Sequence, residues 1–259
     1  MVILMLWRNK IPLSAVIFEG VITIILILIT IFLWRRFVER KRRPVFYLGM
    51  NFTFFTIASI VDTTGRWLGF FLLKYDYLEV SFTDFATILA YIFLAIANIF
   101  VIMFIDVVFF HKGIDFVLPF GILNGVVVGL LIPQLQKWVL NPEFGLVREQ
   151  TPILIFYIVI SLLSYGLLAF FAFREGILNV DRMPKIGFYL IGAFGACLVL
   201  VFISLAGDPI LGALVPAFSQ GYSPLYYAGY SFAIIGTALG YLGYIMPRWF
   251  KNLLTHDEK

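Results

Sequence analysis

Cysteine, histidine and charged residues are scarce in this chain, and each scarcity excludes a class of site. The sequence has one cysteine and two histidines among 259 residues. A single cysteine excludes an intramolecular disulfide, and two histidines exclude a three-histidine zinc centre, so we expect no metal site. The sequence shows no nucleophile–base pair and no phosphate-binding loop, which argues against an enzyme. We also expect no nucleic-acid partner.

The low content of charged residues indicates a membrane protein. Charged residues make up 13% of the chain and apolar residues 62%, and the mean hydropathy is +0.99. A soluble globular domain has about 25% charged residues, so this composition is typical of a chain that lies in lipid. We expect a multi-pass protein of the cell membrane.

Seven apolar segments are each long enough to cross a bilayer core of about 30 Å, which takes about 20 helical residues. They cover approximately 12–34, 45–73, 84–110, 114–135, 152–173, 185–207 and 224–246. We therefore expect one all-α domain over 1–259, a bundle of seven transmembrane helices with no soluble domain. The sequence shows no internal repeat of the kind on which many transporters are built.

Basic residues predict how the bundle is oriented. A basic cluster follows the first segment and consists of Arg35, Arg36, Arg40, Lys41, Arg42 and Arg43. The positive-inside rule places this cluster in a cytoplasmic loop, with the N-terminus outside and the C-terminus inside. Thirteen Lys and Arg residues then lie on the cytoplasmic side, and five lie outside: Arg8, Lys10, Lys74, Lys137 and Arg148.

The basic cluster and the tail at 247–259 are candidate contact surfaces at the cytoplasmic face. One interpretation is that they bind a cytoplasmic signalling protein. The alternative is that they bind anionic lipid headgroups, to which each basic side chain near the surface contributes about 1 kcal/mol.

A polar stripe runs along the second segment. Its residues recur at helical spacing and therefore share one face: Thr56, Ser59, Asp62, Thr63 and Arg66. Asp62 and Arg66 are four residues apart, so they can pair within the helix. Charges inside membrane helices usually face other helices, water or a ligand. Glu19 of the first segment lies at a similar depth.

Two interpretations of these charges stay open. In the first, Glu19, Ser59, Asp62, Thr63 and Arg66 form a polar cavity that is open to the exterior, where Arg66 is available to an anionic or zwitterionic ligand. In the second, the charges form a buried ion network that fixes how the first two helices pack.

Other polar residues are candidates for helix packing or for relaying a signal. Asn98 and Asn124 lie at middle depth in the third and fourth segments, where an interhelical hydrogen bond contributes about 0.6–2 kcal/mol. Asp106 lies near the cytoplasmic end of the third segment. We expect the asparagines to pack helices together and Asp106 to offset neighbouring cations at the membrane surface.

Small residues form stripes on two of the segments. Gly121, Gly125 and Gly129 recur on the fourth segment, and Gly236 and Gly240 belong to a similar stripe on the seventh. Such faces allow helix backbones to approach closely, so we expect both stripes to pack within the bundle. A homodimer through the fourth segment is the alternative, and the seventh segment is a candidate moving element.

Tyrosines are concentrated at the start of the seventh segment, after a loop expected over 208–223. They are Tyr222, Tyr226, Tyr227 and Tyr230. We expect them to form the outer aromatic belt of the membrane protein, with the mouth of a ligand site as the alternative.

The chain departs from two well-known classes of seven-helix protein. Retinal proteins need a lysine in the seventh helix, and 224–246 has none, so we expect no retinal cofactor. G-protein-coupled receptors have an Asp-Arg-Tyr-like end to the third helix, where this chain has Asp106-Val107-Val108. They also have an Asn-Pro-x-x-Tyr-like stretch in the seventh, where this chain reads Gly243-Tyr244-Ile245-Met246-Pro247.

In topology, helix length and shortness of loops, the whole chain resembles the seven-helix sensor modules at the N-termini of prokaryotic histidine kinases and cyclase-type signalling proteins. Those modules are normally fused to a cytoplasmic output domain. The resemblance therefore implies a stand-alone sensor that signals through a separate cytoplasmic protein. The alternative function is a small transporter or channel that uses the same intramembrane charges as its substrate or proton site.

Overall fold

The computed structural model describes residues 11–72, 78–110, 114–140, 147–215 and 222–256, and these residues are helical apart from short connections. The elements are α2 (Leu13–Arg40), α3 (Arg43–Leu72), α4 (Leu78–Ile105) with the π-helical turn η1 (Asp106–Phe110), α5 (Ile114–Leu140), α6 (Val147–Leu178), α7 (Arg182–Leu214), α8 (Pro224–Ile245) and α9 (Arg248–His256). Seven of these helices, α2 to α8, are long and apolar enough to cross a membrane. The predicted all-α architecture with seven such helices is confirmed.

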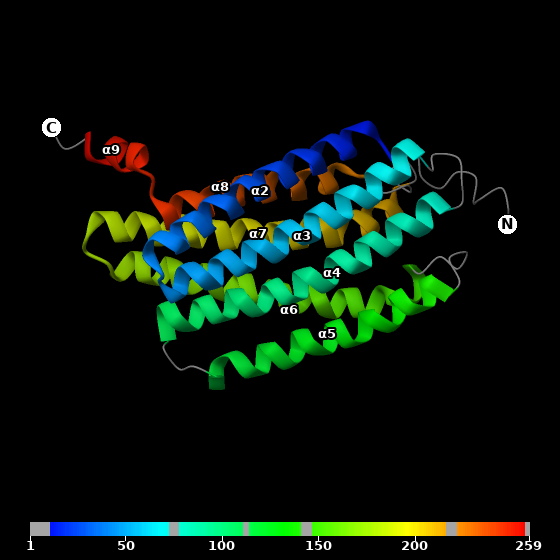
Figure 1. Ribbon diagram of the computed structural model, residues 1–259, viewed down its shortest axis with the longest axis horizontal. Coiled ribbons are helices and arrows are strands. Elements are labelled where there is room, and N and C mark those ends of the chain that lie inside the picture. Colours follow the sequence, from blue (N-terminus) through cyan, green and yellow to red (C-terminus); the bar gives the residue numbers. More distant parts are fainter. Residues whose placement is uncertain (1–10, 73–77, 111–113, 141–146, 216–221, 257–259) are drawn as a thin grey trace.

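The seven long helices form one bundle along the long axis of the molecule (Figure 1). Successive helices run in opposite directions and pack against each other, and α8 also contacts α2, so that the ring closes. The first described residues lie at one end of the bundle, and α9 lies at the other. We call these the N-terminal end and the C-terminal end. The start of α8 lies at the N-terminal end, beside the end of α3.

Large apolar side chains fill the part of the bundle toward the C-terminal end. Leu33, Leu48, Phe104 and Ile105 are all buried there. Lipid is as apolar as these side chains, so close packing and dispersion hold such helices together. This half of the bundle is therefore a packed core.

The basic cluster differs from the expected loop. The α2 helix continues to Arg40, and only Lys41 and Arg42 connect it to α3. Lys41 has a φ of 48° and ends the helix in the left-handed conformation, with its backbone N–H bonded to the Phe37 carbonyl. An ion pair of 2.9 Å between Arg36 and Glu39 supports the extra turns, because charges three residues apart are neighbours on a helix.

Two further segments are helical where the sequence predicted loop or tail. The stretch Asp208 to Leu214 belongs to α7 and not to a loop. Pro209 does not end that helix, because one missing N–H is tolerated where neighbouring helices and side chains satisfy the freed groups. The tail contains α9, whose sequence is RWFKNLLTH. The first correction reflects a helix that continues past its apolar segment, whereas α9 is a separate helix that begins after Met246 and Pro247.

The two glycine stripes have different surroundings. Side chains at Gly236 and Gly240 would meet α7, at Cys197 and Phe194 respectively. The stripe on α5, by contrast, has no atom of another described helix within 4 Å of where a Cβ would stand at Gly121, Gly125 or Gly129. The expectation that this second stripe packs within the bundle is wrong.

The physical reason is that α5 packs against the bundle through a different face. It packs inward through the buried residues Asn124, Val127 and Leu131, which lie on a different side of the helix from the glycines. The homodimer alternative stays a prediction.

Some residues that bear on the orientation lie outside the described part of the chain. They are Arg8, Lys10, Lys74, Lys112 and Lys259.

Candidate ligand-binding site

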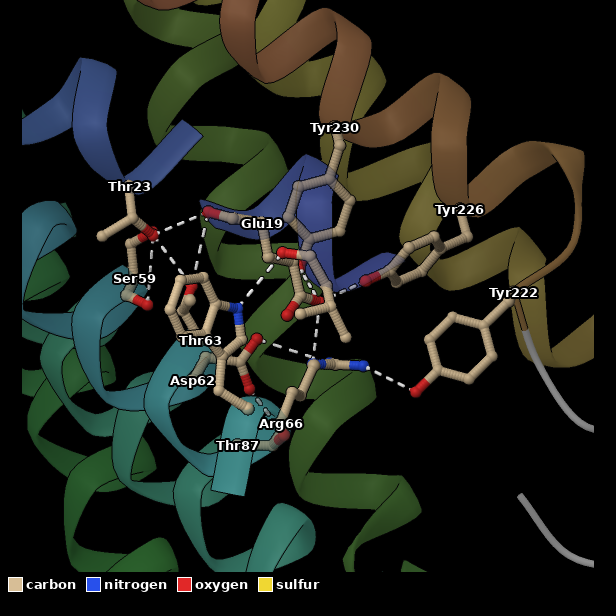
Figure 2. Close-up of polar contacts among 12 residues, drawn as sticks. Glu19, Thr23, Ser59, Asp62, Thr63, Arg66, Thr87, Tyr222, Tyr226 and Tyr230 are labelled. Carbon is tan, nitrogen blue, oxygen red and sulfur yellow. Dashed lines mark hydrogen bonds and ion pairs between the residues drawn. The ribbon is translucent and has the colours of Figure 1, made fainter. Parts of the chain in front are cut away.

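A buried carboxylate, Glu19 on α2, is the centre of the site. Only 1% of the residue's surface is exposed. Its Oε1 atom accepts hydrogen bonds from the hydroxyls of Tyr226 and Tyr230 of α8, the latter at 3.0 Å. The same oxygen lies 2.8 Å from Nε of Arg66 on α3, as an ion pair. The carboxylate therefore joins α2 to both α3 and α8 (Figure 2).

Arg66 has a partner near each of its three nitrogens. Nη2 donates to Oδ2 of Asp62 at 3.4 Å, and Nη1 donates to the hydroxyl of Tyr222 at 3.3 Å. The guanidinium carbon also lies 5.9 Å from the ring centre of Tyr222 and 5.7 Å from that of Tyr226, within the range of cation–π attraction. Arg66 is thus held between two carboxylates and two aromatic rings.

Asp62 extends the network to α4, because its Oδ1 accepts a hydrogen bond of 2.8 Å from Thr87. The pair of Asp62 and Arg66 is the one that their four-residue spacing predicts. The charged cluster of Glu19, Asp62 and Arg66 therefore receives contacts from α2, α3, α4 and α8, as Figure 2 shows.

The hydroxyl residues of the polar stripe mainly join α3 to α2. Thr23 of α2 is hydrogen-bonded to Ser59 at 2.6 Å and to Thr63 at 2.8 Å. Thr56 is bonded in the same way to Thr30, at 2.8 Å. These contacts fit the packing interpretation of the stripe, while Ser59 and Thr63 also line the cavity described next.

A cavity of about 420 Å³ adjoins the charged cluster. Three carboxylates and one guanidinium line it: Asp62, Asp84, Asp208 and Arg66. Its volume is within the range of small-molecule binding sites. Tyr222, Tyr226 and Tyr230 also line it, so these three tyrosines belong to the cavity and not to the expected outer belt.

A second cavity of about 110 Å³ continues the first toward the middle of the bundle. The two share wall residues that are mostly apolar, among them Ile22, Phe55 and Ala233. Asn51 lines the deeper cavity. Its Nδ2 donates to the Ala97 carbonyl at 2.8 Å, whereas its buried Oδ1 atom has no hydrogen-bond partner within the described part of the chain.

Tyr222 lies just before α8, at the N-terminal end of the cavity. Burial raises the pKa of its phenol, an effect that the nearby Arg66 guanidinium opposes. The Tyr222 side chain therefore stays a neutral hydroxyl at neutral pH, and its oxygen accepts the hydrogen bond from Arg66.

The predicted relay residues lie apart from the charged cluster. Asn98 donates to Asn124 at 3.3 Å and to Ser161 at 2.9 Å, so it connects α4 with α5 and α6. Asp106 is buried where α4 passes into η1. Gly236 and Gly240 lie against α7. These contacts establish packing positions, and a relay role stays a prediction.

No pattern in the sequence indicates which residues pair with one another to complete the site. Tyr226 is 207 residues from Glu19 along the chain, and Thr23 and Thr87 resemble any other hydroxyl residue in an apolar helix. The described residues contain no group of three His, Cys, Asp or Glu placed to hold a metal ion.

Comparisons with protein-family models, curated proteins and solved structures give no match to this chain. The fold and the site therefore define its class by themselves. They describe a helical bundle of the multi-pass membrane type, with a charged cavity between its helices.

Proposed function

We propose that this protein is a stand-alone, receptor-like membrane sensor that binds a ligand in the cavity beside Glu19, Asp62 and Arg66. The observation that carries the proposal is the cavity of about 420 Å³ next to a buried charged cluster. Charged groups inside a membrane protein are costly and typically serve function. The protein would detect a ligand as the sensor modules that it resembles do. A separate cytoplasmic protein would then carry the signal onward.

In this proposal the bundle crosses the cell membrane with its N-terminal end outside. The cavity then faces the exterior, and the basic cluster and α9 lie at the cytoplasmic surface, as the positive-inside rule favours. Cysteine labelling of intact cells in a Cys197→Ser background tests the orientation. An impermeant thiol reagent should modify a Ser14→Cys variant and leave an Asn252→Cys variant unmodified, and the reverse pattern would contradict the orientation.

The signal would travel along α8. Tyr226 and Tyr230 on this helix contact the charged cluster, and the Gly236–Gly240 stripe lies closely against α7. Met246 and Pro247 alone connect the same helix to α9. A ligand that displaces the tyrosines therefore has a packed route to the cytoplasmic surface.

The packed core favours a sensor over a carrier. A transporter must open its site to the other side of the membrane, and here Leu33, Leu48, Phe104 and Ile105 fill the bundle between the cavity and the C-terminal end. Opening such a path requires these buried side chains to separate. A sensor needs only a shift between two packed arrangements.

Mild crosslinking and pull-down of the tagged protein from its native membrane tests the proposal. We expect a cytoplasmic signalling protein in near-stoichiometric amount, with less recovered when Lys41 and Arg42 are changed to glutamine. A variant with Gly125→Ala, which alters a position with open surroundings, should recover it unchanged. Recovery of the protein alone, or only with itself, would contradict the sensor and favour a carrier, to be measured by flux into proteoliposomes.

A further inference from the structure

We infer that the cavity binds an organic cation, an amine with an elongated apolar body. This inference rests on the proposed function, because it names the ligand class of the same site. It departs from the anionic or zwitterionic ligand that a single intramembrane arginine suggests in the sequence. Three observations support it: the engagement of Arg66, the excess of carboxylates and the apolar continuation of the cavity.

The first observation is that Arg66 already has its counterions. Nε lies against Glu19 at 2.8 Å and Nη2 against Asp62 at 3.4 Å, while Nη1 donates to Tyr222 at 3.3 Å. An anionic ligand would have to displace one of these partners and then lie beside two carboxylates. Like charges in a poorly hydrated site repel strongly.

The second observation is the balance of charge along the cavity wall. Asp62 and Asp208 line the cavity with Arg66 as the one cation among its described lining residues. Glu19 lies directly behind Arg66 and adds a further carboxylate. The rings of Tyr226 and Tyr230, with centroids 4.8 Å apart, form an aromatic wall beside them. Carboxylates with aromatic faces are the surroundings that stabilise an ammonium group.

The third observation is the shape and lining of the deeper part. The cavity of about 110 Å³ is walled mainly by apolar residues such as Leu26, Leu94 and Val201, which it shares with the larger cavity. Asn51 at this depth has a buried oxygen that receives no hydrogen bond from the described residues. An elongated apolar body therefore fits behind the charged head, and a donor group on that body would satisfy Asn51.

Three probes with one apolar body and different heads test the ligand class: phenylbutylamine, phenylbutyrate and phenylbutanol. Binding is measured by calorimetry on the full chain in lipid nanodiscs, with empty nanodiscs as the control for partitioning into lipid. We expect phenylbutylamine to bind saturably and about tenfold or more tightly than the other two, a difference of about 1.4 kcal/mol. Phenylbutyrate binding more tightly than the amine, or equal binding of all three, would overturn the inference.

Two variants place the binding in this cavity. Asp62→Asn keeps the side-chain shape and removes one charge, so phenylbutylamine should bind about tenfold more weakly and phenylbutanol should be unaffected. Ala233→Phe fills the junction of the two cavities, so phenylbutylamine should lose affinity while ethylamine does not. Gly125→Ala is the matched control and should bind like the unmodified protein. Amine binding that neither cavity variant changes would contradict the site.

The two proposals fail in different ways. If phenylbutylamine binds as expected and the pull-down yields no cytoplasmic protein, the receptor role is wrong and the ligand class stands. If the partner is recovered and phenylbutyrate binds instead of the amine, the ligand class is wrong and the receptor role stands. If no probe binds in nanodiscs, the cation inference is overturned.

Discussion

The Glu19 carboxylate has all of its partners on one oxygen. Oε1 contacts Arg66, Tyr226 and Tyr230, whereas Oε2 is buried and has no hydrogen-bond partner among the residues that the structure describes. Burying a charge is costly unless it is paired. Arg66 is the cation that compensates Glu19, and it compensates Asp62 as well.

Removing the guanidinium should destabilise the fold and, with it, the site. We predict that Arg66→Met lowers the free energy of unfolding by roughly 3–5 kcal/mol, because it leaves Glu19 as an uncompensated buried charge. A second change, Glu19→Gln, should recover a large part of that loss, because the two residues act as one unit. Both effects are measured by chemical unfolding in the same lipid environment. The proteins compared are Arg66→Met, Glu19→Gln, the double variant and the unmodified protein.

An exposed arginine of the same chain provides the control. Arg35 pairs with Glu39 at 3.8 Å, and its side chain is 78% exposed, so Arg35→Met should change stability very little. If Arg66→Met is no more harmful than Arg35→Met, or if the effects of the double variant simply add, the ion network is not what holds α2 and α3 together.

Part of this residue-scale picture could be predicted from the sequence. Residues four apart on a helix are neighbours whatever the tertiary structure, so the pair of Asp62 and Arg66 could be read directly. The bonds of Glu19 to Tyr226 and Tyr230 depend on α8 closing the ring beside α2. The local spacing of residues in a sequence does not predict a contact between segments that are so far apart along the chain.

The helices α5 and α8 carry similar glycine stripes but differ in how these stripes pack. Both carry glycines at helical spacing, but among the described residues only the stripe on α8 faces another helix. Hydropathy does not indicate which side of an apolar helix faces lipid, because both sides are apolar. The seven spans were predictable because length and apolarity are sufficient to define them.

The same substitution on the two stripes should therefore have different effects. We predict that Gly236→Ala destabilises the protein by about 1–3 kcal/mol through overpacking, because the new Cβ would stand 2.7 Å from that of Cys197. Gly125→Ala has open space around it and should leave stability unchanged or slightly higher. Thermal unfolding of both variants checks this, and equal losses would show that the α5 stripe is packed after all.

The short helix α9 is the element that hydropathy missed. Trp249 and Leu253 share one face and are 59% and 61% exposed, and Phe250 and Leu254 are adjacent to them on the same side. The sequence of α9, RWFKNLLTH, also contains basic residues. Amphipathic helices of this kind typically lie in the plane of a membrane surface that contains anionic lipids.

We predict that the apolar face of α9 lies in the membrane surface. An environment-sensitive dye on a Leu253→Cys variant, in the Cys197→Ser background, should emit as if in lipid when the protein is in anionic nanodiscs. The same dye on Asn252→Cys, one position away on the polar arc, should emit as if in water. Identical emission from both positions would contradict the surface orientation of α9.

For the whole molecule, the proposed sensor role requires coupling between the two ends of the bundle. The cavity is lined by residues from the end of α3 and the start of α8, toward the N-terminal end. The basic cluster and α9 lie at the C-terminal end (Figure 1). The closed ring of helices and the packed core provide continuous contacts between these ends. Coupling between two sites is a free energy that acts in both directions.

Whether the cavity controls the cytoplasmic contact is tested by the yield of the crosslinked partner. That yield is measured with the unmodified cavity and with a cavity that lacks one carboxylate. Asp62→Asn and the unmodified protein are compared in the native membrane, at matched expression and matched thermal stability, with Gly125→Ala as the control. We predict that Asp62→Asn changes the yield of the partner complex several-fold, while Gly125→Ala does not. Equal yields from all three proteins would contradict a sensor in which the cavity controls the cytoplasmic contact.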